Sequence, residues 1–128
     1  MPSITLDNEA GQCWRNPSKR LILREIGRID TGDGNSICCL STPWNSYVQA
    51  LHGLNGWHVE WRDTARNNLN RYRHFRASYP DGSRRKRLLR KGDTYVSCGL
   101  EKDLLVIDDV VQCFLAFRLS ERKPNRFE

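Results

Sequence analysis

The clearest pattern along the chain is an alternation of apolar and polar side chains between Ser46 and Asp63. A two-residue period of this kind is typical of strands that bury one face and expose the other. The sequence Gly-Leu-Asn-Gly at residues 53–56 interrupts the pattern and indicates a turn. We therefore expect two antiparallel strands joined by this turn, Ser46–Leu51 and Trp57–Arg62.

The second strand divides its side chains into two sets. Trp57, Val59 and Trp61 point to one side and are expected in the core, while the polar set His58, Glu60 and Arg62 points to the other. In the simplest register the polar set lies beside Tyr72, His74 and Arg76 of a later strand. These side chains would form a mixed-charge face for a partner. Ordinary ion pairing on a solvated face is an equally consistent interpretation.

Further strands are expected before and after this pair in the sequence. They are Ser36–Ser41 and Tyr72–Ser78, and the segments Leu88–Leu89 and Thr94–Cys98 are candidates for one or two more. The connections between the strands are short, which favours antiparallel neighbours.

Apolar residues at helical spacing predict a helix near each end of the chain. The first would begin with Asn16 as its N-cap and Pro17 in its first turn, and the second with Asp108 as its N-cap. The predicted buried stripes are Ile22, Leu23, Ile26 and Ile29 in the first helix and Val110, Val111, Phe114 and Phe117 in the second. Together these elements predict one α+β domain over residues 1–128. It is an antiparallel sheet of four to six strands covered on one face by an N-terminal and a C-terminal helix.

Composition is that of a globular protein, with 38% hydrophobic and 28% charged residues in 128. The longest apolar runs are far shorter than the ~20 residues of a membrane span, and no apolar stretch typical of a signal peptide opens the chain. We therefore expect a cytoplasmic protein. The five cysteines are odd in number and lack the spacing of a zinc site, so buried free thiols are expected.

The net charge of +6 is concentrated in residues 84–91, a segment with six basic residues and no acidic one. The rest of the chain is therefore neutral overall. A basic block of this kind is a common footprint for nucleic acid or an acidic partner. It is equally common on a solvated loop, or on a hairpin edge where Lys and Arg prevent unwanted strand pairing.

The catalytic motifs in the sequence are incomplete. His58-Val59-Glu60 matches the H-x-E half of the zinc deaminase signature, but the P-C-x-x-C half is absent and His58 lies in a predicted strand. The chain also contains no G-x-S-x-G sequence and no P-loop. We therefore expect no enzyme activity, no bound metal and no cofactor.

Five segments in order carry a family resemblance: NPSKRLILREIGRIDTGDGNSICCLS, SYVQALHG, GWHVEWRD, RYRHFRAS and IDDVVQCFLAFRLSERKPNRFE. In their order and spacing, from Asn16 to Phe127, the chain resembles the first-numbered immunity-protein family of bacterial polymorphic toxin systems. The most specific parts are Tyr47–Gln49, Val59–Arg62 and the closing helix followed by Arg122-Lys123-Pro124. The sequence departs from the family's pattern in its more basic RRKRLLRK block and in ending at Glu128, where relatives commonly continue to a tryptophan.

The resemblance implies an α+β protein that binds a cognate toxin domain, such as a nucleic-acid deaminase, and blocks its active site. The expected partner is then a protein, bound one to one, with no membrane involved. The candidate partner-binding residues are Glu60, Arg62, His74 and Arg76 near the centre of the contact, and Arg84, Arg85, Lys86 and Arg87 for electrostatic steering. The alternative function is a small nucleic-acid-binding module that uses the basic segment 84–91.

Overall fold

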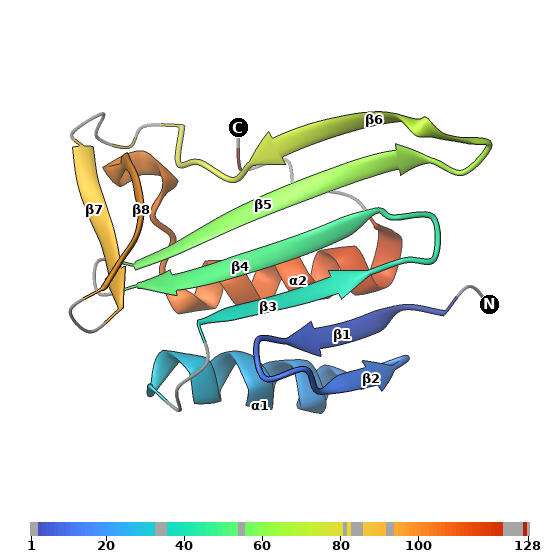
Figure 1. Cartoon of the computed structure of the whole chain (residues 1–128), viewed down its shortest axis with the longest axis horizontal. Coiled ribbons are helices and arrows are strands. Elements are labelled where there is room, and N and C mark those ends of the chain that lie inside the picture. Colours follow the sequence, from blue (N-terminus) through green and yellow to red (C-terminus); the bar gives the residue numbers. More distant parts are fainter. Residues whose placement is uncertain are drawn as a thin grey trace.

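The computed structural model of the chain describes residues 3–32, 36–53, 56–80, 82, 86–91, 94–121 and 127, with the backbone alone for residues 86–91 and 94–101. Its main feature is a six-stranded antiparallel sheet with the strand order β2-β1-β3-β4-β5-β6 (Figure 1). The strands are β1 Thr5–Asn8, β2 Cys13–Arg15, β3 Ile37–Ser41, β4 Tyr47–Gly53, β5 Gly56–Ala65 and β6 Asn68–Arg76. Together with the helices α1 (Lys19–Asp30) and α2 (Ile107–Ser120), this sheet confirms the predicted α+β class.

The predicted hairpin is formed by β4 and β5, which pair from Tyr47 opposite Arg62 to Gly53 opposite Gly56. Gly56 has a φ of +135°, a conformation that side chains rarely adopt. A Cβ atom at this position would also lie 3.2 Å from the Cβ of Leu104. Both observations explain why glycine stands at the start of β5.

The sheet is widened by two strands that the sequence pattern did not predict. β1 and β2 form a hairpin in which the N–H of Asn8 donates to the carbonyl of Gln12, and the N–H of Gln12 donates to the Asn8 side-chain oxygen, both at 3.1 Å. β1 then pairs with β3, from Thr5 opposite Ser41 to Asn8 opposite Cys38. The two strands are too short to show a clear alternation, so pairing rather than local pattern explains their presence: β1 pairs with β3, and β2 pairs with β1.

The segments predicted as extra strands of the main sheet instead form a separate hairpin. β7 (Lys86–Lys91) pairs with β8 (Thr94–Leu100) in a two-stranded antiparallel sheet. In Figure 1 this hairpin lies at the end of the main sheet where β4 ends and β5 begins. Pro80, which cannot donate a ladder hydrogen bond, follows β6 closely in the sequence and explains why the meander does not continue there.

Both helices begin at positions other than those predicted. The N-cap of α1 is Ser18, whose hydroxyl accepts a hydrogen bond from the N–H of Leu21 at 3.1 Å. Asn16 has a positive φ of 49°, and its side-chain Oδ1 accepts a hydrogen bond from the N–H of Ile4 at 3.1 Å. The Asn16 side chain therefore holds the chain just before β1 rather than capping α1. α2 begins after Val106 without a side-chain cap, and Asp108 lies in its first turn, where a negative charge favours the helix dipole.

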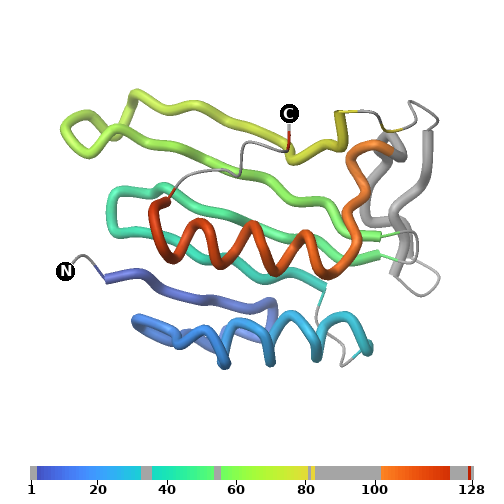
Figure 2. The backbone as a smooth tube through the Cα atoms, turned by 180° about the vertical axis from the view of Figure 1, so that it is seen from behind, coloured from blue at the N-terminus to red at the C-terminus, as the bar shows by residue number. Residues whose placement is uncertain are grey.

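The helices and the sheet share one hydrophobic core. Both helices lie behind the sheet in Figure 1 and in front of it in the reverse view of Figure 2. Leu23, predicted in the buried stripe of α1, is 40% exposed because its side chain leaves the helix in a different direction from those of Ile22, Ile26 and Ile29. Val111 of α2, also predicted in a buried stripe, is only partly buried. The remaining predicted core residues are buried: Ile22, Ile26, Ile29, Val110, Phe114, Phe117, Trp57, Val59 and Trp61.

The connection from β8 to α2 is tied to the sheet. The 3₁₀ helix η1 (Glu101–Asp103) leads to Leu105, whose backbone exchanges two hydrogen bonds with that of Trp57, at 2.8 and 3.1 Å. The position of α2 over the sheet is thus fixed at its N-terminal end. Neither α1 nor α2, the helices of the described part of the chain, is long and apolar enough to cross a membrane.

Candidate protein-binding face

The side of the sheet that faces away from the helices is polar along the last three strands, β4, β5 and β6, and we call this surface the open face. Its side chains alternate with buried residues such as Val48, Val59 and Trp61, so they point to the opposite side. This side faces the viewer in Figure 1. The open face consists of Tyr47, Gln49 and Leu51 from β4, His58, Glu60 and Arg62 from β5, and Tyr72, His74 and Arg76 from β6.

The pairing of β5 with β6 brings together the four site residues that were predicted on these strands. Glu60 lies opposite Arg76 and Arg62 lies opposite His74, so these residues lie side by side as expected from the sequence. Side-chain exposures of 36% for Glu60 and 45% for Arg76 leave both partly open to solvent. The four residues therefore form one continuous block on β5 and the edge strand β6.

Arg62 is held in place by an aromatic neighbour on the next strand. Its guanidinium carbon lies 3.7 Å from the centre of the Tyr72 ring, an arrangement favoured by the electrostatics of the aromatic face. Its Nε also donates a hydrogen bond to the hydroxyl of Thr64 at 3.3 Å. Because the side chain is already oriented, less conformational entropy is lost when a partner carboxylate or phosphate binds it.

Tyr47 and His74 connect β4 with β6 across the intervening strand. The Tyr47 hydroxyl and the His74 Nε2 are 2.7 Å apart, and the two rings meet edge to face with centroids 5.9 Å apart. Burial, followed by the negative charge of Glu60, raises the pKa of Tyr47, so the phenol stays protonated at neutral pH. The two rings therefore form an aromatic surface next to the Arg62 cation.

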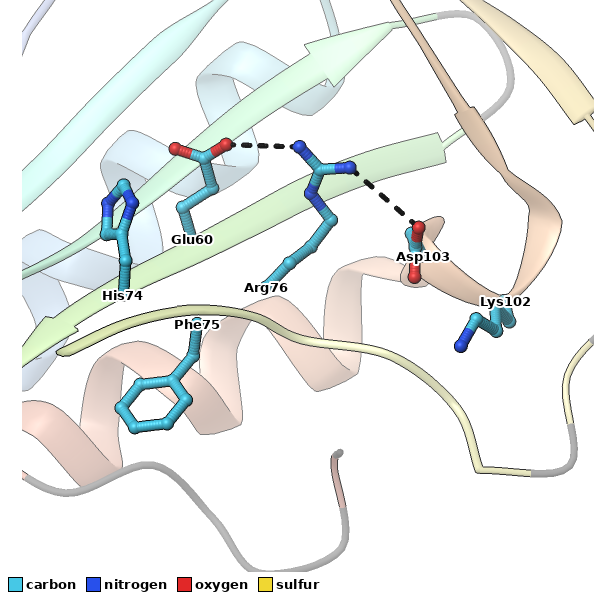
Figure 3. Close-up of a pocket in the computed structure, with 6 residues that line it drawn as sticks. All are labelled: Glu60, His74, Phe75, Arg76, Lys102 and Asp103. Atoms are coloured by element: carbon cyan, nitrogen blue, oxygen red, sulfur yellow. Dashed lines mark hydrogen bonds and ion pairs between the residues drawn. The ribbon is translucent and has the colours of Figure 1, made fainter.

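Arg76 joins the open face to η1. Its guanidinium lies 3.5 Å from a carboxylate oxygen of Glu60 and 3.9 Å from one of Asp103 (Figure 3). The second oxygen of Asp103 accepts a hydrogen bond from the hydroxyl of Ser78. In Figure 3 the side chains of Glu60, His74 and Arg76 lie on one side of the strands and Phe75 lies on the other. Two carboxylates thus position one cation at the edge of the sheet.

His58 departs from the expectation for the open face. Alternation correctly places it on the same side as Glu60, but the residue is only 4% exposed. Burial lowers the pKa of His58, and the positive charge of Arg76 lowers it further, against the opposite effects of Asp103 and Glu60. The imidazole is therefore neutral at physiological pH and forms part of the floor of the face rather than its charged surface.

Two hollows flank Arg76 on its two sides. The first, of ≈ 410 Å³, lies between β6 and η1, and the second, of ≈ 180 Å³, lies over β4 and β5. The first is lined by Glu60, His74, Phe75, Arg76, Lys102 and Asp103, and the second by Gln49, Leu51, His58, Glu60 and Arg76. Both have charged walls, so they suit polar side chains of a partner better than an apolar ligand.

The basic residues that were predicted to steer the partner lie mostly beyond the described side chains. Arg84 and Arg85 lie outside the described residues. Lys86 and Arg87 begin β7, where the backbone alone is described. β7 contacts β4 and lies at the end of the sheet where β4 finishes, the opposite end of that strand from Tyr47.

The cysteines agree with the sequence prediction except at one position. Cys38 and Cys113 are buried, and Cys39 is partly buried, with a pKa that burial raises to about 12. Cys13 is exposed, because β2 is the outermost strand of the sheet. Cys98 lies in β8, outside the described side chains. Within the described part of the chain, no group of three His, Cys, Asp or Glu side chains is arranged to hold a metal ion.

Two residues of the site, Tyr47 and Asp103, were not predicted as site residues from the sequence. Tyr47 follows the alternation of β4, but nothing in the sequence shows that it reaches His74 two strands away. Asp103 lies in a segment without a periodic pattern, and only the return of the chain through η1 brings it to Arg76. No known protein-family model, curated protein or solved structure matches the chain.

Proposed function

We propose that this protein is an immunity protein, which binds a cognate toxin domain in the cytoplasm of the producing bacterium and blocks the toxin's active site. In this proposal the two helices cover one face of the sheet and the open face binds the toxin. A nucleic-acid deaminase is the first toxin class to test. The observation that carries the proposal is the block formed by Glu60, Arg62, His74 and Arg76, partly exposed and already oriented on a rigid sheet.

The block has the features of a protein-binding surface. Tyrosine and arginine dominate the binding energy of many interfaces, because they combine large contact areas with hydrogen bonding. Here Tyr47, Tyr72, Arg62 and Arg76 lie together, and each is already in contact with a neighbour on another strand. A surface that is ordered before binding retains more of its gross interaction energy as affinity.

The charged residues of the site are expected to affect the association and dissociation rates differently. Exposed charges at the rim mainly raise the association rate, while desolvated charge pairs mainly slow dissociation. In the proposal, Arg84, Arg85, Lys86 and Arg87 attract an acidic rim of the toxin, and Glu60 and Arg62 form the inner contacts. The inhibition needs no chemistry by the immunity protein, because occupying the toxin's cleft excludes its substrate.

The test is binding to the toxin domain encoded next to this gene, measured by surface plasmon resonance and by rescue of growth when toxin and protein are co-expressed. Arg62→Ala and His74→Ala are each expected to weaken binding by about tenfold or more. Glu60→Ala should chiefly speed dissociation. Reversal of the four basic residues to Glu should slow association and flatten its dependence on salt.

A matched control is Arg20→Ala, which removes an exposed arginine from α1. Its effect on binding should be within experimental error, because α1 lies on the other side of the sheet. Equal losses in Arg20→Ala and Arg62→Ala would contradict the assignment of the open face. Absence of toxin binding, together with salt-dependent binding of single-stranded DNA that is lost on charge reversal, would favour the nucleic-acid-binding function instead.

A further inference from the structure

β6 is the last strand of the six-stranded sheet, and its outer edge faces away from β5. Among the described residues no strand pairs with this edge. Eight of its nine residues are exposed, the exception being the partly buried Phe75. Edges of this kind present backbone N–H and C=O groups that can pair with another chain.

The hydrogen bonds of β5 show which backbone groups of β6 point outward. The N–H of Ala77 donates to the carbonyl of Val59 at 2.8 Å, and the register places these two residues opposite each other. Hydrogen-bonded and non-hydrogen-bonded pairs alternate along an antiparallel ladder. Phe75 and Arg73 therefore bond to β5, whereas the N–H and C=O groups of Tyr72, His74 and Arg76 point away from it.

The same three residues carry their side chains on the open face. A chain that pairs with the outer edge of β6 would therefore lie directly beside the block proposed to bind the toxin. The hollow of ≈ 410 Å³ between β6 and η1 continues from His74 past Arg76 to Lys102. It provides space for the end of such a chain where β6 ends.

The positive charge of β6 favours an acidic partner. β6 contains Arg71, Arg73, His74 and Arg76 and no acidic residue. Arg71 and Arg73 form no ion pair with the described residues. Pairing of β6 with β6 of a second copy would bring like charges together, which disfavours self-association. An extended segment with acidic side chains on either face would instead meet opposite charges.

We propose that the outer edge of β6 binds an extended, acidic segment of the partner protein by strand addition, through the backbone groups of Tyr72, His74 and Arg76. This inference depends on the proposed function only for the identity of the partner. In strand addition the main-chain hydrogen bonds contribute affinity and the alternate side chains contribute specificity. The segment would become a seventh strand of the sheet, next to β6.

Backbone amide hydrogen exchange, followed by NMR on the labelled full-length protein, tests the inference directly. In the free protein the amides of Tyr72 and His74 should exchange faster than that of Arg73, which bonds to β5. Two probes are then added: the toxin domain encoded next to the gene, and a capped peptide of alternating Glu and Val. Either probe, when bound, should slow exchange at Tyr72, His74 and Arg76 by about tenfold or more. A peptide of alternating Lys and Val is the control and should have no effect.

A pair of variants separates the backbone from the side chain. His74→Pro removes an outward N–H without removing a bond to β5, and His74→Ala removes the side chain but keeps that N–H. The proline variant should lose at least about tenfold more affinity for the acidic peptide than the alanine variant. Circular dichroism establishes that each variant folds. If the proline variant does not fold, the exchange measurement on the unchanged protein decides.

The outcomes distinguish this inference from the proposed function. Toxin binding without slower exchange at β6, and with equal affinities of the two His74 variants, would overturn strand addition and leave the immunity function standing. Slower exchange with the acidic peptide but no toxin binding would support strand addition and contradict the immunity function. Strand addition is refuted if neither probe slows amide exchange in β6. It is also refuted if single-stranded DNA binds β6 without slowing amide exchange there and the acidic peptide does not bind.

Discussion

Replacing Phe114 by alanine is expected to destabilise the protein by about 3–5 kcal/mol. Phe114 lies near the middle of α2, is fully buried, and belongs to the core that α2 shares with the sheet. Removing its ring takes apolar surface out of the core and leaves a cavity. Close-packed neighbours fill such a cavity only in part, so the loss exceeds the transfer free energy of the removed atoms alone.

The expected effect is large on the temperature scale. An unfolding entropy of about 2.1 cal/mol/K per residue corresponds to about 0.27 kcal/mol/K for the chain of 128 residues. The substitution should therefore lower Tm by about 10–20 °C. Urea unfolding provides a second measurement, and circular dichroism and tryptophan fluorescence should give the same midpoint if unfolding is two-state.

Leu119→Ala is the matched control for this prediction. Leu119 belongs to the same helix but is 87% exposed, so its truncation should change the free energy of unfolding by no more than about 0.5 kcal/mol. A Phe114→Ala protein with an unchanged midpoint would refute the packing of α2 against the sheet. Equal destabilisation by both substitutions would show that helix propensity, rather than burial, determines the stability of α2.

Three further predictions concern other parts of the molecule. Ser18→Ala removes the N-cap of α1 and should cost about 1 kcal/mol in urea unfolding, and a change near zero would show that the cap is not needed. Burial lowers the pKa of folded His58, so the unfolded state binds more protons than the folded state as the pH falls below about 6.5, and the free energy of unfolding should decrease through this range. A His58→Gln variant with the same pH dependence of stability would show that His58 is not its cause. In the native protein, exposed Cys13 should be alkylated before buried Cys38, as peptide mass spectrometry can measure; faster labelling of Cys38 would be inconsistent with its place in the core.

Some of the candidate site could be predicted from the sequence because it depends on strands that are close in the chain. The alternation in Trp57–Arg62 correctly assigned Trp57, Val59 and Trp61 to the core and Glu60 and Arg62 to the opposite side. Simple antiparallel pairing then correctly predicted which residues of β6 lie beside them. These results follow from the period of a strand and from short connections, which are local properties.

Other parts of the fold were wrong or missing because they depend on distant contacts. Strand alternation predicts the side of the sheet on which His58 lies, but not what packs against that side. The burial of His58 was therefore not predicted. The strands β1 and β2 carry almost no pattern of their own; β1 forms by pairing with β3, and β2 by pairing with β1. Leu88–Leu89 and Thr94–Cys98, named only as candidates for further strands, lie within β7 and β8, but only the folded chain shows that these strands leave the main sheet.

The division between the two kinds of information has one physical cause. Periodicity and turn chemistry act within a few residues, and they determined the class of the fold, the β4–β5 hairpin, the buried face of α2 and the polar nature of the open face. The tertiary structure alone decided which distant groups complete the site, above all Asp103 at Arg76 and Tyr47 at His74. Such pairs form because packing brings separate segments within a few ångströms, and the linear order of residues carries no signal for that distance.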